Sequence, residues 1–149
     1  MKKEKKIKIN YIKFIKKQYV PSKYNFATWV NFSVIEKFIN HVNLIFVGQK
    51  RMRTLSNKFL NKDKPTNVLT FPNNDKFCNG DIVLCPEIIN KEAKKYGFSN
   101  DFRWAHMIVH SMLHLQGFNH STKRDRLFME KTEVKLLNSM NFGNPYVRS

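Results

Sequence analysis

Polar and apolar residues alternate or cluster in four short segments, and this pattern predicts four β-strands. The first segment, "KIKINYIKF" (6–14), changes character at almost every position, as expected of a strand with one buried face. Short apolar runs follow in "HVNLIFVG" (41–48), "TNVLTFP" (66–72) and "GDIVLC" (80–85). Glycine or proline borders each of these three runs, which sets their expected ends.

Between these segments, apolar residues recur at helical spacing and predict five helices. The first begins at Ser22, and its expected apolar face consists of Phe26, Trp29, Val30, Val34 and Phe38. The others are expected at about 50–60, 86–97, 100–116 and 122–140. Pro86 suits a first helical turn, and Thr122 with Asp125 three residues later resembles a capping box.

Four strands and five helices predict an α+β fold, in which helices cover a small sheet. The chain has 149 residues and no repeat or flexible linker, so we expect a single domain over 1–149. Its apolar runs are too short to span a bilayer, and its basic start lacks the pattern of a signal peptide. Cys78 and Cys85 lack CxxC spacing, and we expect reduced thiols, as in the cytosol.

Positive charge dominates the composition. Lysine and arginine number 27 against 11 aspartates and glutamates, which gives a formal net charge of +16. Such a charge attracts polyanions and favours a nucleic-acid partner. The alternative is a lysine bias that only solvates the surface.

The segment "HSMLHLQGFNH" carries the candidate chemistry. His110 and His114 are four residues apart and share one face of a helix. Gly117 can adopt the left-handed conformation that ends a helix, so that the chain turns back and brings His120 to the same point. Three neutral imidazoles on a tetrahedral ion leave a fourth position free, as in catalytic zinc sites. We therefore predict one divalent ion per chain.

Two other histidines are expected to play different roles. His106 lies one further turn before His110 and is too distant from His120 to join the site, so we assign it to the cleft wall or the core. His41 opens a predicted strand and is expected to be structural. Ser111 occupies the position at which metzincin proteases, with HExxHxxGxxH, carry the general base. Protease activity is therefore not expected.

Four segments carry a resemblance to a known family: "KDKPTNVLTFP", "GDIVLCPEII", "WAHMIVHSMLHLQGFNH" and "NFGNPY". In order and spacing, from about Asn57 to Tyr146, they resemble the YbeY family of bacterial ribosomal RNA maturation endoribonucleases. The resemblance implies a cytoplasmic enzyme, with zinc as cofactor and a mixed four-stranded sheet. It also implies a cleft with the metal site at one end, where His110, His114 and His120 match the family's metal ligands and catalytic residues.

The implied activity is metal-dependent cleavage of single-stranded RNA. The implied role is late-stage maturation of the 16S ribosomal RNA 3′ end and ribosome quality control. The implied partner is the small ribosomal subunit, and binding to a membrane is not expected. The main alternative is a ribosome- or RNA-binding assembly factor whose zinc is structural and whose nuclease activity is weak or lost. A third reading, a metal hydrolase acting on a small substrate, fits the large positive charge less well.

The chain departs from the family pattern at three positions. Ser111 replaces a glycine and Asn119 replaces an aspartate. The family pattern "YRGKD" reads "FLNKD", so Leu60 replaces an arginine that the family is thought to use at its RNA site. Leucine cannot form the two hydrogen bonds by which arginine holds a phosphate.

Residues near position 60 are candidate RNA contacts: Lys58, Lys62, Thr66 and Asn67. The basic residues Lys50, Arg51 and Arg53 precede them, although a run of charge also suits a solvated helix face. Thr66 and Asn67 also suit the start of a strand. Asp81 is open to three roles: orienting an imidazole, serving as a base or shaping a turn.

Overall fold

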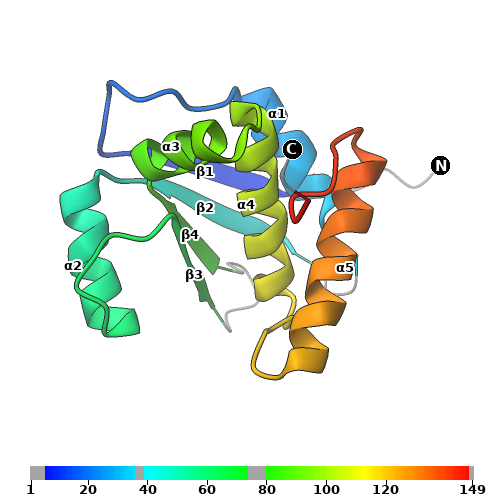
Figure 1. Cartoon of the computed structure of the whole chain (residues 1–149). Helices are drawn as coiled ribbons and strands as arrows, with labels where there is room; N and C mark the ends of the chain where they lie inside the picture. The colour runs from blue at the N-terminus through cyan, green and yellow to red at the C-terminus, as the bar shows by residue number, and fades with distance from the viewer. Residues whose placement is uncertain (1–5, 36–38, 74–79, 148–149) are drawn as a thin grey trace.

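Strands and helices follow one another in the order that the hydrophobic pattern predicts. The computed structural model describes residues 6–35, 39–73 and 80–147. The elements are β1 (Lys8–Lys13), α1 (Lys23–Phe32), β2 (His41–Phe46), α2 (Gln49–Leu60), β3 (Val68–Pro72), β4 (Gly80–Leu84), α3 (Pro86–Tyr96), α4 (Asn100–Leu115) and α5 (Lys123–Ser139). They form a single small domain (Figure 1).

The four strands form one mixed sheet in the order β1-β2-β4-β3. β1 pairs with β2 and β2 with β4 in parallel, whereas β3 is antiparallel to β4. A parallel pair requires a crossover connection, and α1 supplies it between β1 and β2. The prediction of a four-stranded mixed sheet with five helices is confirmed.

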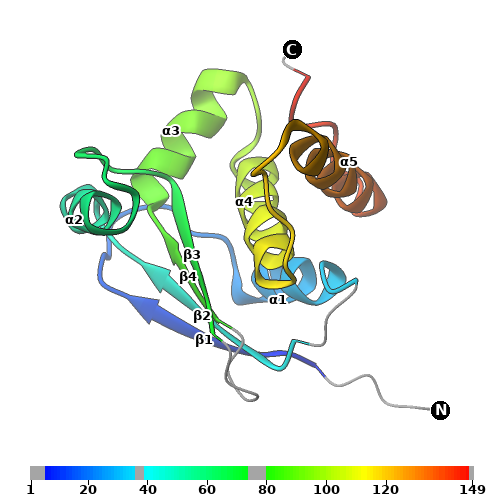
Figure 2. The ribbon, with the colours of Figure 1, turned by 90° about the horizontal axis from the view of Figure 1, so that it is seen from below.

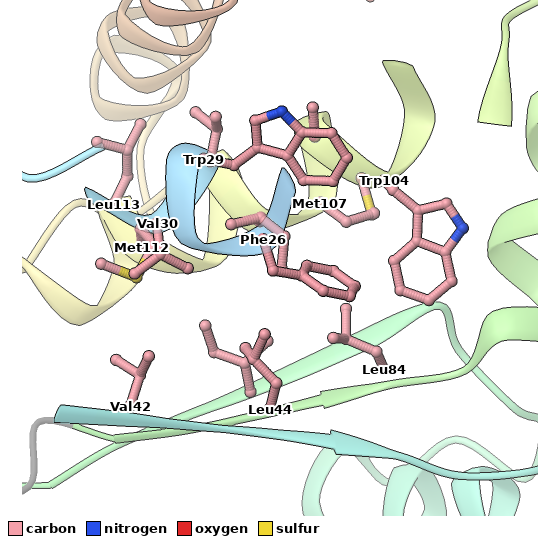
Figure 3. Packing of buried hydrophobic residues seen from close by; sticks show 14 of the residues in the cluster. Phe26, Trp29, Val30, Val42, Leu44, Leu84, Trp104, Met107, Met112 and Leu113 are labelled. Atoms are coloured by element: carbon pink, nitrogen blue, oxygen red, sulfur yellow. The ribbon is translucent and has the colours of Figure 1, made fainter. Parts of the chain in front are cut away.

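Helices cover the two faces of the sheet unequally. On one face, α1 and α4 pack over the strands and α5 lies along the outer side of α4 (Figures 1 and 2). Side chains from these helices meet the sheet in one core, shown in Figure 3 by Phe26 and Met112 above Val42, Leu44 and Leu84. On the other face, α2 contributes Met52 to a smaller cluster. Each such fully buried large side chain stabilises the fold by about 1.5–3 kcal/mol.

The central helix α4 positions the candidate site. Its start is capped by Ser99, whose hydroxyl accepts a hydrogen bond from the backbone N–H of Phe102 at 3.1 Å. Most of its side chains are buried, including Met112 and Leu113. His110 and His114 are half-buried on the side that faces α5. A largely buried helix therefore carries two of the three predicted ligands.

Element ends differ slightly from the predicted ones. α1 ends at Phe32, and Phe38, predicted to extend its apolar face, lies outside the described residues. β3 begins at Val68, so Thr66 and Asn67 precede the strand. Thr122 caps α5 as predicted, because its hydroxyl accepts from the backbone N–H of Asp125 at 3.0 Å. Within the described part of the chain, no helix has the length and apolar character needed to cross a membrane.

Candidate metal centre

Three imidazoles meet at the carboxyl end of α4. Nε2 of His114 lies 3.1 Å from Nε2 of His110 and 3.0 Å from Nε2 of His120. One ring nitrogen from each residue lies within 4.8 Å of the other two. The structure thus brings together the three residues that the sequence singles out.

The turn after α4 brings His120 to the other two. Gly117 has a φ of 98°, a left-handed conformation that glycine adopts without strain. Its N–H donates to the carbonyl of His114, and the N–H of Phe118 donates to the carbonyl of Leu113, both at 3.0 Å. These two bonds form a Schellman motif. The predicted role of Gly117 in ending the helix is confirmed.

The donor set fits a divalent ion. Tetrahedral zinc with bonds of about 2.0–2.1 Å has ligand nitrogens roughly 3.3 Å apart, close to the distances between the Nε2 atoms. Burial, then the charges of His110 and His120, lower the pKa of His114 from 6.5 to about 4. The imidazole is therefore neutral at physiological pH, as a metal ligand must be. The three histidines could hold a metal ion.

A buried glutamate, not predicted from the sequence, lies behind the histidines. Glu133 on α5 is fully buried, and its Oε1 lies 3.0 Å from Nδ1 of His110. The Tyr146 hydroxyl donates to both oxygens, at 2.9 Å and 2.7 Å, and Nε2 of His106 lies 3.3 Å from Oε2. His106, predicted to be wall or core, thus belongs to the shell that surrounds the triad.

The hydrogen bonds define where the protons sit. Arg103 Nη1 lies 3.1 Å from Nδ1 of His106; because a guanidinium only donates, this nitrogen accepts. His106 then carries its proton on Nε2 and donates it to Glu133. His110 likewise donates from Nδ1 to Glu133, which leaves the lone pair of its Nε2 facing the centre of the triad.

The pKa values of Glu133 and His106 are both lowered. Burial raises the pKa of Glu133, but hydrogen bonds from His106 and His110 outweigh it and lower the pKa from 4.5 to about 2. Burial lowers the pKa of His106. Glu133 is therefore a carboxylate at neutral pH, and the His106 imidazole that donates to it is neutral.

The network continues to the start of β3. Glu92 on α3 accepts from Arg103 Nη2 at 3.1 Å and from the amide of Asn67 at 3.1 Å. Asn67, predicted as an RNA contact, is thus joined through Glu92 and Arg103 to His106. Its side-chain amide already has a protein partner.

A cavity opens beside the triad. It has a volume of about 230 Å³ and is lined by His110, His120, Arg126, Met129, Glu130, Glu133 and Tyr146. At about 30 Å³ per water, it holds several water-sized groups. A ligand can therefore reach His110 and His120 from the side of α5.

The other predicted RNA contacts lie elsewhere. Lys58 is on the last turn of α2, and Lys62 and Thr66 follow this helix. Leu60 ends α2 and is 45% exposed. Among the described residues, no hydrogen bond, ion pair or cavity joins Lys58, Lys62 or Thr66 to the triad, so their assignment stays a prediction.

The family departures have distinct surroundings. Ser111 is fully buried, and its hydroxyl has no hydrogen-bond partner among the described residues. The Asn119 side chain accepts from the backbone N–H of Ser121 at 3.1 Å, so it shapes the loop before α5. Leu60 is partly exposed at the end of α2. None of these three departures from the family pattern changes a residue of the histidine triad.

Asp81 lies on the far side of the sheet from the triad, so it neither orients a triad imidazole nor acts there as a base. It lies within β4 and accepts from the amide of Asn43 at 2.8 Å. Its neighbour Ile82 belongs to the core beneath α4, and successive strand residues point to opposite faces. The carboxylate of Asp81 therefore faces away from α4, and the turn role is also excluded because the residue lies in a strand.

Two further predictions concern single residues. His41 begins β2, and its Nε2 lies 2.8 Å from the amide nitrogen of Asn10 on β1, in agreement with the structural role predicted for it. Cys85 is a free, buried thiol, and burial raises its pKa. Cys78 lies outside the described residues.

Sequence reasoning missed Glu133, Arg103, Tyr146 and Arg126. A signal existed for Glu133, because it lies between Met129 and Leu136 on the buried face of α5. A single carboxylate on an otherwise apolar helix face is costly to bury without partners. Such a position indicates a buried polar network.

Comparisons with known proteins agree on one family. The family model described as Endoribonuclease YbeY matches residues 3–141. The Endoribonuclease YbeY of Buchnera aphidicola subsp. Schizaphis graminum is 38% identical over 133 residues, which cover 85% of this chain and 84% of the relative. That of Wigglesworthia glossinidia brevipalpis is 41% identical over 133 residues, with 85% and 88% covered.

A solved structure supports the same fold. The solution structure of a Thermotoga maritima protein superposes with a TM-score of 0.51 at 21% identity, covering 94% of this chain and 99% of that one. At this identity the likeness concerns the fold alone. The family model spans nearly the whole domain and the two relatives are more than 30% identical, so this chain belongs to the YbeY endoribonuclease family.

Proposed function

We propose that the protein is a metal-dependent endoribonuclease that cleaves single-stranded RNA. The observation that carries the proposal is the convergence of three imidazole nitrogens beside a cavity, in a chain whose relatives are named endoribonucleases. The biological role that fits is late-stage maturation of the 16S ribosomal RNA 3′ end and ribosome quality control. The partner is then the small ribosomal subunit, and the location is the cytoplasm.

The proposed cofactor is one zinc ion per chain, held by His110, His114 and His120. The nitrogen-only donor set and its spacing suit zinc. When bound, zinc supplies a Lewis acid that offsets the charge developing on the phosphoryl oxygens during cleavage. Glu133 orients the His110 ring so that its Nε2 faces Nε2 of His114, and Tyr146 and His106 hold Glu133 in place.

The protein is proposed to contact RNA mainly through the phosphate backbone of the RNA. The net charge of +16 attracts a polyanion, and the proposed contacts on and after α2 are Lys58, Lys62, Thr66 and Asn67. The side-chain amide of Asn67 donates to Glu92. Asn67 therefore contributes most simply by holding this neighbouring side chain in position.

One observation favours a second function. Leu60 offers no hydrogen-bond donor at the position where the family pattern has arginine. A chain without this cation could serve as a ribosome- or RNA-binding assembly factor, with a structural zinc and weak or lost nuclease activity.

The deciding experiment incubates zinc-loaded protein with an RNA fragment that contains the 16S 3′ end. Wild type is expected to cleave it, and His114→Ala, confirmed as folded by circular dichroism, is expected to be inactive. Binding of the fragment without cleavage would support the assembly factor. Equal cleavage by wild type and His114→Ala would exclude the triad as the site of chemistry.

A further inference from the structure

We infer that the cavity between the triad and α5 is a phosphate subsite, in which Arg126 binds a phosphate of the RNA. This inference rests on the proposed function for the identity of the ligand. The cavity measures about 230 Å³, and its lining brings Arg126 to the same space as His110 and His120. A group held by Arg126 therefore lies next to the metal ligands.

Arg126 is available for a ligand. Arg53 is paired with Asp63 at 2.9 Å, and Arg103 with Glu92 at 3.1 Å. Arg126, in contrast, forms no ion pair or side-chain hydrogen bond with any described residue, although Glu130 is only one turn away. Its five N–H donors remain for a partner that enters the cavity.

The remaining polar groups of the cavity allow an anion. Glu133 lines it, but both of its oxygens already accept hydrogen bonds from Tyr146, and each also lies near an imidazole nitrogen. Glu130 is then the one carboxylate of the lining that has no such partner. The positive charges that oppose the negative charge of Glu130 are those of Arg126 and of the ion proposed for the triad.

Phosphate is the chemical class that this arrangement suits. A planar guanidinium binds two phosphate oxygens through parallel hydrogen bonds. An ion held by the neighbouring triad would add a divalent charge beside the same group. A phosphodiester in this cavity would be oriented by the Arg126 side chain and by an ion at the triad, which is the positioning that phosphodiester cleavage requires.

The test compares zinc-loaded wild type with Arg126→Ala, Arg126→Lys and Arg124→Ala. Arg124 is exposed on the same turn of α5 and does not line the cavity, so its loss matches the change in charge. The probe is adenosine 5′-monophosphate, and its dissociation constant is measured by calorimetry. Arg126→Ala should weaken binding about 10- to 100-fold, Arg126→Lys by less, and Arg124→Ala by no more than about twofold.

Zinc content and thermal unfolding accompany each measurement. Equal affinity of wild type and Arg126→Ala for the nucleotide, with zinc and fold intact, would overturn the subsite, as would equal losses in Arg126→Ala and Arg124→Ala. Glu130→Gln should strengthen nucleotide binding, because it removes the one free carboxylate. A second equivalent of zinc that Glu130→Gln abolishes would show that the cavity takes a cation, and would also overturn the subsite.

Cleavage of a single-stranded RNA separates this inference from the proposed function. The same Arg126→Ala substitution should lower kcat/KM by about 10- to 100-fold. If wild type binds the nucleotide through Arg126 but cleaves no RNA, the nuclease function fails and the subsite stands. If wild type cleaves RNA and Arg126→Ala cleaves it equally well, the subsite fails and the nuclease function stands.

Discussion

Glu133 Oε1 lies 3.0 Å from His110 Nδ1, and this contact joins two helices that are adjacent in space. The carboxylate is buried and accepts the Nδ1 proton, so the opposite nitrogen of the ring faces His114 with its lone pair. Such carboxylate–histidine pairs fix the tautomer and orientation of metal-ligating imidazoles. The position of α5 against α4 therefore determines how the candidate metal centre is held.

We predict that Glu133→Gln lowers zinc affinity about 10- to 100-fold, because the neutral amide accepts the His110 proton less strongly. Competition with a chromophoric chelator measures the affinity. The control is Glu130→Gln, which removes the same charge one turn earlier on α5 and forms no hydrogen bond to a histidine among the described residues. Similar zinc affinity of Glu133→Gln and wild type would contradict the positioning role.

Removal of Arg103 should destabilise the fold. Its ion pair with Glu92 has side chains only 11% and 23% exposed, and Arg103→Ala leaves both Glu92 and His106 Nδ1 without this donor. We expect a loss of about 2–3 kcal/mol in the free energy of unfolding, measured with urea. Arg53→Ala breaks an exposed pair, with side chains 57% and 68% exposed, and should lower stability much less, because solvent screens exposed ion pairs. Equal losses would refute this ranking.

Stability of the metal-free protein should fall in acid in two stages. The pKa of His114 is about 4 when folded against 6.5 for the free side chain, so the unfolded chain binds more protons in this window and stability decreases from pH 6.5 to 4. The pKa of Glu133 falls from 4.5 to about 2. The contribution of the Glu133 carboxylate to the stability of the fold is fully present above pH 4.5 and is lost as the pH falls through about 2.

Urea midpoints measured across this pH range test both stages. His114→Ala should reduce the slope between pH 4 and 6.5 without abolishing it, since burial also lowers the pKa of His106. Stability that rises as the pH falls from 6.5 to 4 would contradict the assignment of neutral, buried imidazoles.

The hydroxyl of Ser111 is expected to cost stability. It is buried without a hydrogen-bond partner among the described residues, and serine is a poorer helix former than alanine. Ser111→Ala should therefore stabilise the protein by about 0.5–1.5 kcal/mol with unchanged zinc affinity. Differential scanning calorimetry checks the result, and a lower melting temperature for this variant would show that the hydroxyl has a partner.

The sequence predicted those parts of the site that are local along the chain. His110 and His114 share a helix face, and Gly117 ends that helix, so the spacing alone places His120. Glu133 is 23 residues from His110, and its role depends on how α5 packs against α4. No periodicity encodes that packing.

The fold shows the same division between local features, which were predicted, and packing between distant segments, which was not. Each element was predicted from its own apolar pattern, such as the alternation in β2 that buries Val42, Leu44 and Phe46. Asp81 was misjudged because its role depends on which face of the sheet α4 covers. The order of the strands, and therefore their neighbours, follows from packing between distant segments.

Zinc content measured by elemental analysis on gently purified variants tests the central claim, that His110, His114 and His120 hold one metal ion. Wild type and His41→Ala, whose imidazole bonds to Asn10 on the sheet, should each retain one equivalent per chain. His110→Ala, His114→Ala and His120→Ala should each be strongly depleted while remaining folded. Full occupancy in His114→Ala, or depletion in His41→Ala equal to that of the triad variants, would contradict the assignment.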